Sequence, residues 1–432
     1  MSDFQAKFQY AGGAGAQEGA CRVHFDAQSL TLTPENGAAM TFDLGDLDAV
    51  SAADYEIRLP IYTGKAIVLR QLGRAFDTVA HDLTDAYRNR AVQCMLLEDM
   101  QEVARFNGNF DLAGASGPAE IRLYKSNLAV LPAASAAFQW RLADLDDVKF
   151  DSSAYAVTLQ SGEARLKFTK LARRTEELAE KIREGMNALA TSTAQALHGM
   201  LPFLDPDQLQ ACGAILREGR SASLAKLTTI HKQIPTALAK NAVDKDLKPY
   251  YDALAAKAAP GLGYAGFKLI RSEGGASDDA DAAEKDDDNA TGAMDADADA
   301  PETLYWFLLP LAGRSGSAPA NVVAWEASSK SGRATYFFRM VEPSQAATLR
   351  DPAVVDASVR RLNRVLGMMN FRRRPIYLSD DELAMDPKFH RYAIAARRIA
   401  EVREVRASFL GRAAHTSLDA WQKQVESILT KA

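Results

Sequence analysis

The sequence predicts an α+β protein in which one small sheet-plus-helix domain occurs twice within the first 190 residues. A helical segment and a C-terminal α+β domain are expected to follow. Three observations support this. The motif Asp46–Val50 (DLDAV) recurs as Asp144–Val148 (DLDDV), apolar and polar residues alternate around both copies, and each copy ends in an amphipathic helix. A repeat of this length indicates a duplicated domain rather than a solenoid unit.

Short β-strands are expected around both motifs. Apolar and polar residues alternate there with a period of two, which is typical of half-buried strands. The pattern occurs in the first copy at 21–26, 55–59 and 66–70, and in the second at 120–124, 155–159 and 164–168. The two sets align outward from the repeated motif, which supports duplication.

One helix is expected to close each copy. Apolar residues step by three and four from Phe76 to Cys94 in the first copy and from Leu178 to Leu189 in the second. This spacing places one apolar stripe against a sheet. Arg88 and Arg90 lie off the stripe of the first helix and are expected to face water.

This order of elements resembles the pleckstrin-homology-like (PH-like) superfold, a bent seven-stranded sheet closed by a C-terminal helix. The resemblance implies PH-like repeat 1 at 1–100 and PH-like repeat 2 at 101–190, and it indicates no narrower family. The fold hosts many functions.

The resemblance also bears on lipid binding. PH-like domains that bind phosphoinositides carry Lys or Arg in the loop between the first two strands. The loops expected at 11–20 and 113–119 contain neither residue. Arg22 and Arg122 follow these loops as single, solvated strand residues, whereas a phosphate site needs several charged donors. Phosphoinositide is therefore an unlikely ligand.

Composition places the chain among ordinary globular proteins. Of its 432 residues 47% are hydrophobic and 25% charged, and no apolar run approaches the roughly 18 residues of a membrane helix. The N-terminus has no signal-peptide pattern, and the three cysteines are scattered. We expect a cytoplasmic protein without membrane insertion, and the heavy use of Ala and Arg suits a bacterial source.

The second half begins with a predicted helical linker at 191–260, in which Asp205 and Pro206 start one helix. Gly261–Gly266 formally matches G-x-G-x-x-G. A dinucleotide fingerprint follows a strand and opens a helix. These glycines follow a predicted helix and precede a predicted strand, which favours a plain connection.

The C-terminal domain is expected at 261–432. Its strongly apolar strands include 303–310 and a hairpin of 321–327 with 334–340, and they are typical of burial on both faces. A helix should follow around 354–366, then a last strand at 376–378 and C-terminal helices.

An acidic insert interrupts this domain at 273–301 and is expected to be disordered, because it has no aromatic residue with which to build a core. Residues 278–302 carry eleven acids and one base, a net charge of −10; since the chain carries −5, the remainder sums to +5. The insert is either a solvated insertion or an electrostatic mask over a basic surface of the same chain.

No catalytic, cofactor-binding or metal-binding residue can be assigned, and we expect no enzymatic activity and no cofactor. The acid pairs Asp46/Asp48 and Asp144/Asp146 could hold a metal ion. Their equal placement in both repeats favours a structural role, in which Asp side chains accept hydrogen bonds from nearby backbone N–H groups.

Arginine is concentrated in the C-terminal domain, and this group is the predicted partner- or anion-binding surface. Its members are Arg360, Arg361, Arg364, Arg372, Arg373, Arg374, Arg397 and Arg398. The alternative is a solvated helix face that pairs locally with Glu401 and Glu404.

The leading functional hypothesis is a non-enzymatic protein-binding or scaffold protein whose partner is another protein or a second copy of itself. The alternative is a nucleic-acid-associated protein that uses the C-terminal arginines, with the acidic insert as an internal competitor. A metal-dependent hydrolase that uses the Asp pairs is the third.

Overall fold

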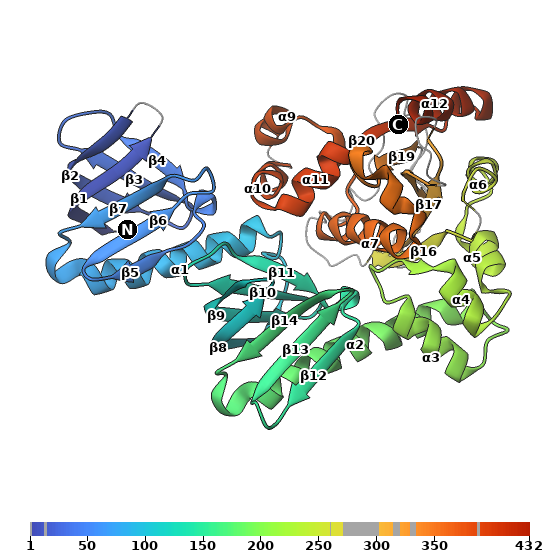
Figure 1. Ribbon diagram of the computed structural model, residues 1–432, viewed down its shortest axis with the longest axis horizontal. Helices are drawn as coiled ribbons and strands as arrows, with labels where there is room; N and C mark the ends of the chain where they lie inside the picture. The colour runs from blue at the N-terminus through green and yellow to red at the C-terminus, as the bar shows by residue number, and fades with distance from the viewer. Residues whose placement is uncertain are drawn as a thin grey trace, which may run out of the picture. The chain divides into compact units, whose positions relative to one another are not determined.

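The structure is a computed structural model that describes residues 2–12, 15–259, 261–270, 302–313, 320–328, 334–386 and 389–432. The chain forms two compact units (Figure 1). Unit 1 comprises Met1–Gly185 and Asp380–Ala400, and unit 2 comprises Met186–Ser379 and Glu401–Ala432. The acidic insert predicted at 273–301 lies outside the described residues.

Repeat 1, which the sequence predicts to be PH-like, is a seven-stranded antiparallel sheet with the order β4-β3-β2-β1-β7-β6-β5. Strand β1 pairs with both β2 and β7 and so joins the two halves of the sheet. The strands are β1 (Ser2–Gly12), β2 (Gly15–Phe25), β3 (Ser29–Pro34), β4 (Met40–Asp43), β5 (Ser51–Ala53), β6 (Glu56–Pro60) and β7 (Ala66–Arg70). Helix α1 (Phe76–Cys94) closes the repeat, as the apolar spacing predicts.

Repeat 2 has the equivalent strand order, β11-β10-β9-β8-β14-β13-β12. Helix α2 (Thr175–His198) follows its last strand. The strands are β8 (Glu102–Leu112), β9 (Ala115–Tyr124), β10 (Asn127–Pro132), β11 (Phe138–Arg141), β12 (Asp147–Asp151), β13 (Ala156–Ser161) and β14 (Ala164–Thr169). The predicted fold class, with two sheet-plus-helix repeats before a further α+β region, is confirmed.

The predicted loops at 11–20 and 113–119 are mostly wrong. In both repeats the first two strands run on toward a tight hairpin, with Lys7 opposite Ala20 and Leu112 opposite Ala115. Gly and Ala have low intrinsic strand propensity, but here continuous pairing with a neighbouring strand outweighs that preference.

Helix α1 packs on two partners within unit 1. Val79, Leu83 and Tyr87 are buried in the core of repeat 1. The same hydrophobic cluster includes Ala129 and Leu131 of β10 in repeat 2. Strand β10 is buried along its whole length, whereas the matching β3 alternates between buried and exposed positions. The two repeats therefore share one apolar core through α1.

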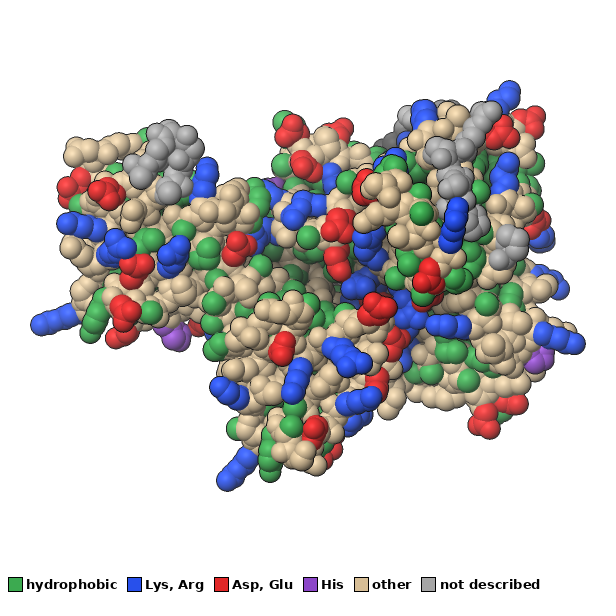
Figure 2. All heavy atoms as spheres, viewed as in Figure 1, with side chains coloured by type: hydrophobic (Ala, Val, Ile, Leu, Met, Phe, Trp, Pro, Cys, Tyr) green, Lys and Arg blue, Asp and Glu red, His purple; other side chains and the backbone are tan. Residues whose placement is uncertain are grey.

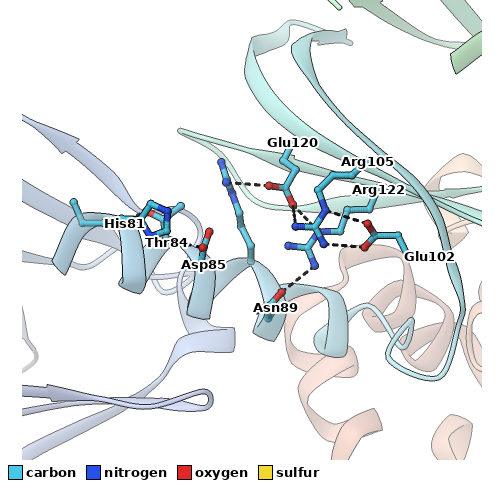
Figure 3. A network of polar contacts seen from close by, with 10 residues as sticks. His81, Thr84, Asp85, Asn89, Glu102, Arg105, Glu120 and Arg122 are labelled. Atoms are coloured by element: carbon cyan, nitrogen blue, oxygen red, sulfur yellow. Dashed lines mark hydrogen bonds and ion pairs between the residues drawn. The ribbon is translucent and has the colours of Figure 1, made fainter. Parts of the chain in front are cut away.

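A network of charged side chains lies beside this shared core (Figure 3). Glu120 of β9 accepts hydrogen bonds from Arg88 of α1 at 3.1 Å and from Arg122 at 2.6 Å. Arg122 also donates to Asn89 of α1 at 3.0 Å. At the edge of the network Arg105 pairs with Glu102.

Three predictions about exposure are therefore wrong. Arg122 is only 5% exposed and Arg90 only 8%, and Arg88 is directed toward repeat 2 rather than toward water. Arg88 pairs with Glu120 and Arg90 with Asp43, 32 and 47 residues away in sequence. Arg122 pairs with Glu120, two residues before it, and its long-range partner is Asn89 of α1. A single-domain amphipathic pattern cannot show such pairs, because the partner belongs to a different part of the fold.

Unit 2 is built on a six-stranded antiparallel sheet with the order β15-β16-β17-β18-β19-β20. The strands are β15 (Ala222–Ser223), β16 (Tyr264–Ile270), β17 (Glu302–Leu311), β18 (Val322–Ser328), β19 (Ala334–Arg339) and β20 (Phe409–Ala414). The predicted hairpin is confirmed, because β18 pairs with β19.

Helices contribute to the packing on both faces of this sheet. One core cluster joins the sheet to α3 (Pro206–Ile215), α4 (Leu224–Ile230), α5 (Ile234–Ala242), α6 (Lys248–Ala255) and α12 (Leu418–Lys431). Trp306 instead donates its indole N–H to Asn363 of α7 (Pro352–Met368) at 3.1 Å. The stretch predicted as a linker is thus helical and part of a core. Burial on both faces explains why the strands lack a clean polar alternation.

The G-x-G-x-x-G match has a packing explanation. Gly263 and Gly266 lie at the start of β16, after α6, as expected for a helix-to-strand connection. A Cβ atom at Gly266 would overlap the indole of Trp306 on the neighbouring strand. The glycine is required by that close approach rather than by a phosphate.

The predicted strand at 376–378 is wrong, because Arg374–Tyr377 forms the short helix α8. Pro375 sits in its first turn, where proline is pre-set for a helix. The C-terminal helices expected beyond it include α9 (Asp380–Met385), α10 (His390–Arg398) and α11 (Ala400–Ser408), and β20 follows α11. Among these, α9 and α10 belong to unit 1.

Candidate functional site

The first acidic turn, residues Asp43–Asp48, connects β4 to β5 through the 3₁₀ turn η1 (Leu44–Asp46). Asp43 starts it by accepting the Gly45 N–H at 2.7 Å. Leu44 and Leu47 are buried in the core of repeat 1. Asp46 and Asp48, which flank Leu47, keep about a quarter to a third of their side-chain surface exposed.

Helix α10 ends on this turn with two adjacent arginines. Arg397 Nε donates to Asp46 Oδ1 at 2.8 Å. Arg398 donates from one terminal nitrogen to Asp48 Oδ1 at 2.8 Å and to the Leu47 carbonyl at 3.0 Å. Each arginine thus pairs with its own carboxylate, and Arg398 also donates a hydrogen bond to the backbone of the turn.

Tyr62 completes the contact from the segment that follows β6. Its backbone N–H donates to the Asp46 carbonyl at 3.0 Å. The guanidinium carbons of Arg397 and Arg398 lie 5.9 and 5.3 Å from the centre of its ring. A ring at this distance attracts a cation through its quadrupole, so both charges are held by an acid and an aromatic face.

Gly45 lies close to both α1 and α10. A Cβ atom there would come within 2.5 Å of Cys94 Sγ and 3.5 Å of Ile394 Cγ2. Ile394 is 3% exposed and precedes Arg397 by one helical turn. The apolar and charged contacts of α10 therefore lie on one helix face.

Burial sets the electrostatics of this turn. Burial raises the pKa of Asp46, and the nearby guanidinium of Arg397 acts in the opposite direction. At Asp43 burial acts in the same direction, but hydrogen bonds from Arg90 and Gly45 outweigh it and lower the pKa. Burial raises the pKa of the Cys94 thiol to about 12, which makes it an inert core group.

The second acidic turn, residues Arg141–Asp146, differs in charge from the first. Arg141 occupies the position of Asp43 and lies 3.6 Å from Asp144. Asp146 Oδ2 accepts the backbone N–H of Gly162 at 2.7 Å. The structural role predicted for the acid pairs is therefore seen at Asp146, whereas Asp46 and Asp48 bind arginine side chains.

A second ionic contact holds the other end of α10. Arg391 lies 2.8 Å from Asp99 and 3.4 Å from Glu98, in the connection between α1 and β8. The neighbouring Tyr392 is buried. The segment Asp380–Ala400, which we call the docked segment, is thus fixed to repeat 1 at both ends of α10.

The eight predicted arginines are divided between the two units. Arg397 and Arg398 belong to unit 1, and the other six belong to unit 2. On α7, Arg360 pairs with Asp356, Arg361 with Glu404 and Arg364 with Glu401. Arg372 and Arg373 are buried, and Arg374 begins α8. Their role in binding a partner stays a prediction.

Charges of both signs are interspersed over the visible face of both PH-like repeats (Figure 2). Among the described residues, no group of three or more His, Cys, Asp or Glu side chains is placed to hold a metal ion. The polar feature that distinguishes repeat 1 from repeat 2 is the contact of its acidic turn with Arg397 and Arg398.

Sequence reasoning missed a buried polar cluster in unit 2. Thr335 of β19 donates its hydroxyl proton to Glu326 of β18. The same oxygen accepts from Trp421 Nε1 at 2.9 Å and lies 3.1 Å from His415 Nε2. His415 Nε2 also lies 3.4 Å from Glu326, so the carboxylate, the hydroxyl, the imidazole and the indole form one cluster.

This cluster is closed to solvent. The side chains of Glu326 and His415 are each 2% exposed, and the ring of Tyr250 stacks on His415 with centroids 4.3 Å apart. The sequence signal was Glu326 itself, a single acid in the otherwise apolar strand Val322–Ala327. A buried acid is costly unless paired, so it indicates a partner elsewhere in the chain.

No protein-family model matches the chain, and no curated protein matches it. One similar solved structure is the C-terminal domain of an unknown protein from Leishmania infantum, with 12% identity, a TM-score of 0.20, and coverage of 23% of this chain and 96% of that chain. Another is the Spt16D Pob3N heterodimer, with 18% identity, a TM-score of 0.16, and coverage of 37% and 82%. Likeness this low supports no inference about function.

The length and hydropathy of the helices also bear on membrane insertion. Within the described part of the chain, each helix is too short or too polar to cross a membrane.

Proposed function

We propose that this chain is a non-enzymatic protein-binding protein in which PH-like repeat 1 recognises α-helices that end in two adjacent arginines. The observation that carries the proposal is the contact of Arg397 and Arg398 with Asp46 and Asp48. Here the first acidic turn already binds a helix from a distant part of the chain. A partner helix with the same residues would meet the same chemistry.

The geometry supports recognition of a helix rather than of an isolated charge. Ile394, Arg397 and Arg398 are spaced by three and four residues, so one helix face presents one apolar and two cationic groups. This spacing of anchors is typical of peptides that bind as helices in a groove. The Leu47 carbonyl adds a hydrogen bond to Arg398 that is independent of charge.

The use of the Asp pairs supports a non-enzymatic role. Asp46 and Asp48 each pair with a guanidinium, so their negative charges are already neutralised and are not available to coordinate a metal ion. In repeat 2, Asp146 accepts a backbone N–H. Both uses are those of binding and structural groups.

Ion pairing also favours a protein partner over nucleic acid. Five of the eight predicted arginines lie within 3.2 Å of a carboxylate, and two more are buried. A phosphate would have to displace those carboxylates, which weakens the electrostatic gain that drives nucleic-acid binding.

A labelled peptide tests the receptor directly. The probe is a fluorescent peptide of residues 386–400, measured by anisotropy against full-length protein. Ile394→Asp combined with Arg397→Ala and Arg398→Ala should release the docked segment, and this variant should bind the peptide at least tenfold more tightly than wild type does. Adding Asp46→Asn and Asp48→Asn should abolish that gain.

Two controls make the result decisive. Arg360→Ala with Arg364→Ala removes two arginines from α7 and should leave peptide binding at the wild-type level. A peptide with both arginines replaced by alanine should not bind. If the released variant remains folded by circular dichroism and still does not bind the wild-type peptide, the proposed receptor is wrong.

Capture from cells distinguishes the two classes of partner. Tagged full-length protein should retain a discrete protein after nuclease treatment, and the 386–400 peptide should displace it. Recovery of nucleic acid, with proteins lost on nuclease treatment, would contradict the proposal.

A further inference from the structure

PH-like repeat 1 contains a pocket of about 390 Å³ that shares no residue with the first acidic turn. It lies between the β5–β6 turn and the segment that joins β7 to α1. Asp54, Tyr55 and Glu56 line one side, and Arg70 and Phe76 line the other, together with Gln71, Leu72 and Gly73. Its volume falls at the lower end of the range for small-ligand sites.

The backbone of the β5–β6 turn presents Tyr55 to this pocket. Asp54 and Tyr55 have φ values of 51° and 59°, the left-handed pair typical of a two-residue hairpin turn. Tyrosine is an unusual residue at such a position, where Gly or Asn is preferred. Its side chain is 76% exposed, yet its ring lies 5.4 Å from that of Phe76.

The charges in the pocket leave one acid in excess. Arg70 Nε donates to Glu56 at 2.7 Å and so neutralises that carboxylate. Among the residues that the structure describes, Asp54 makes no side-chain hydrogen bond or ion pair. The pocket therefore combines two aromatic rings with a net charge of −1 from Asp54, Glu56 and Arg70.

The duplication shows that the fold does not require these side chains. The matching turn of repeat 2 is a longer loop, 152–155, but it also ends in a left-handed tyrosine, Tyr155 at φ 44° and 66% exposed. The connection to the closing helix also matches, with left-handed residues at Lys170 and Ala172 as at Gln71 and Gly73. The aligned side chains differ, however: Ala154, Ala156, Thr169 and Thr175 replace Asp54, Glu56, Arg70 and Phe76.

We propose that this pocket binds an organic cation, the guanidinium or alkylammonium group of an arginine or lysine side chain or of a free amine. Aromatic faces attract such cations, and a carboxylate adds a charge-assisted hydrogen bond. Asp54 would repel an anion, and Arg70 cannot offset that repulsion because it already pairs with Glu56. The proposal goes beyond helix recognition at the first acidic turn and uses different residues.

Titration followed by NMR tests the pocket in the full-length protein, with the Tyr55 ring signals as readout. The probes are N-acetyl-arginine N-methylamide, a pentapeptide with one central arginine, and spermidine; N-acetyl-glutamate N-methylamide is the anionic control. The cations should shift Tyr55 and leave Tyr155 unchanged. At least tenfold tighter binding of the pentapeptide than of spermidine would identify a peptide side chain as the ligand, and the reverse a free amine.

Substitutions then separate charge from ring contact. Measured by isothermal titration calorimetry, which does not depend on the Tyr55 ring signals, Asp54→Asn and Tyr55→Ala should each weaken cation binding by roughly fivefold, because each removes one modest attraction. Tyr155→Ala is the matched control and should not change it. Both pocket positions are exposed, so folding should be retained and can be checked by circular dichroism.

Three outcomes would overturn the proposal. These are equal shifts at Tyr55 and Tyr155, equal binding of the anionic control, or no loss on Asp54→Asn and Tyr55→Ala. None of them bears on the 386–400 peptide experiment, so the two proposals can fail separately.

Discussion

Arg398 and Asp48 are 350 residues apart in the sequence, and their side chains meet at 2.8 Å. The pair anchors helix α10 to a turn of repeat 1. It is partly buried, with 10% of the Arg398 side chain and 32% of the Asp48 side chain exposed. Partial burial makes such a pair stronger than an open surface ion pair.

The Asp48–Arg398 pair should show measurable coupling. In a double-mutant cycle of Asp48→Ala and Arg398→Ala, we expect about 1–2 kcal/mol from urea unfolding. The exposed pair Lys248–Asp252 on α6 is the control, with about 0.3–0.5 kcal/mol expected. Hydrogen exchange of the α10 amides should also speed up in Asp48→Ala. Equal coupling in the two cycles would show that burial adds nothing to the anchor.

Glu120 should be essential to the junction between the two repeats. Glu120→Gln leaves Arg88 and Arg122 without their carboxylate in a site where Glu120 itself is only 6% exposed. Removing one partner of a buried ion pair costs about 3 kcal/mol or more. Urea denaturation should show this loss, while exposed Glu163→Gln should stay within about 0.5 kcal/mol of wild type. A loss as small as that of the control would mean that water replaces the carboxylate.

Asp43 should make the stability of repeat 1 depend on pH. Its folded-state pKa is lowered from the ordinary value of 3.8, chiefly because Arg90 outweighs the cost of burial. The ionised form therefore stabilises the fold above that value, and this contribution disappears as the pH falls through the lower folded-state pKa.

The measurement is the difference in unfolding free energy between wild type and Asp43→Asn. We expect about 2 kcal/mol at pH 7, from the loss of charge-assisted hydrogen bonds to Arg90. The difference should hold down to about pH 5 and shrink below the ordinary Asp pKa of about 3.9. A difference that grows on acidification would contradict the assigned pKa direction.

Thr335 should hold the buried cluster of unit 2 together. Thr335→Val keeps the shape but removes the hydroxyl shared by Glu326, His415 and Trp421. Buried polar groups left without partners cost about 1–3 kcal/mol each, so we expect a loss of about 3 kcal/mol. Tryptophan fluorescence during urea unfolding reports it. Thr430→Val removes a hydroxyl bonded only to its own helix and should change stability by less than about 0.5 kcal/mol.

The sequence by itself determined the duplicated architecture. The alternation in 55–59 and 155–159 and the helical spacing from Phe76 to Cys94 are local periodicities, and each matches an observed element. One further signal was present but not used. The sequence is continuously apolar from Leu128 to Pro132 where Ser29–Pro34 alternates, and the structure buries both faces of the former.

Only the tertiary structure decided which charges meet. Arg88, Arg90 and Arg122 look like solvated residues in sequence, and Asp46 and Asp48 resemble Asp144 and Asp146. Apart from Glu120, which lies two residues from Arg122, their partners lie in the other repeat, in the first acidic turn or some 350 residues away. An ion pair depends on the distance between two side chains in space, and no local period encodes that distance, so the candidate site became visible only in the folded chain.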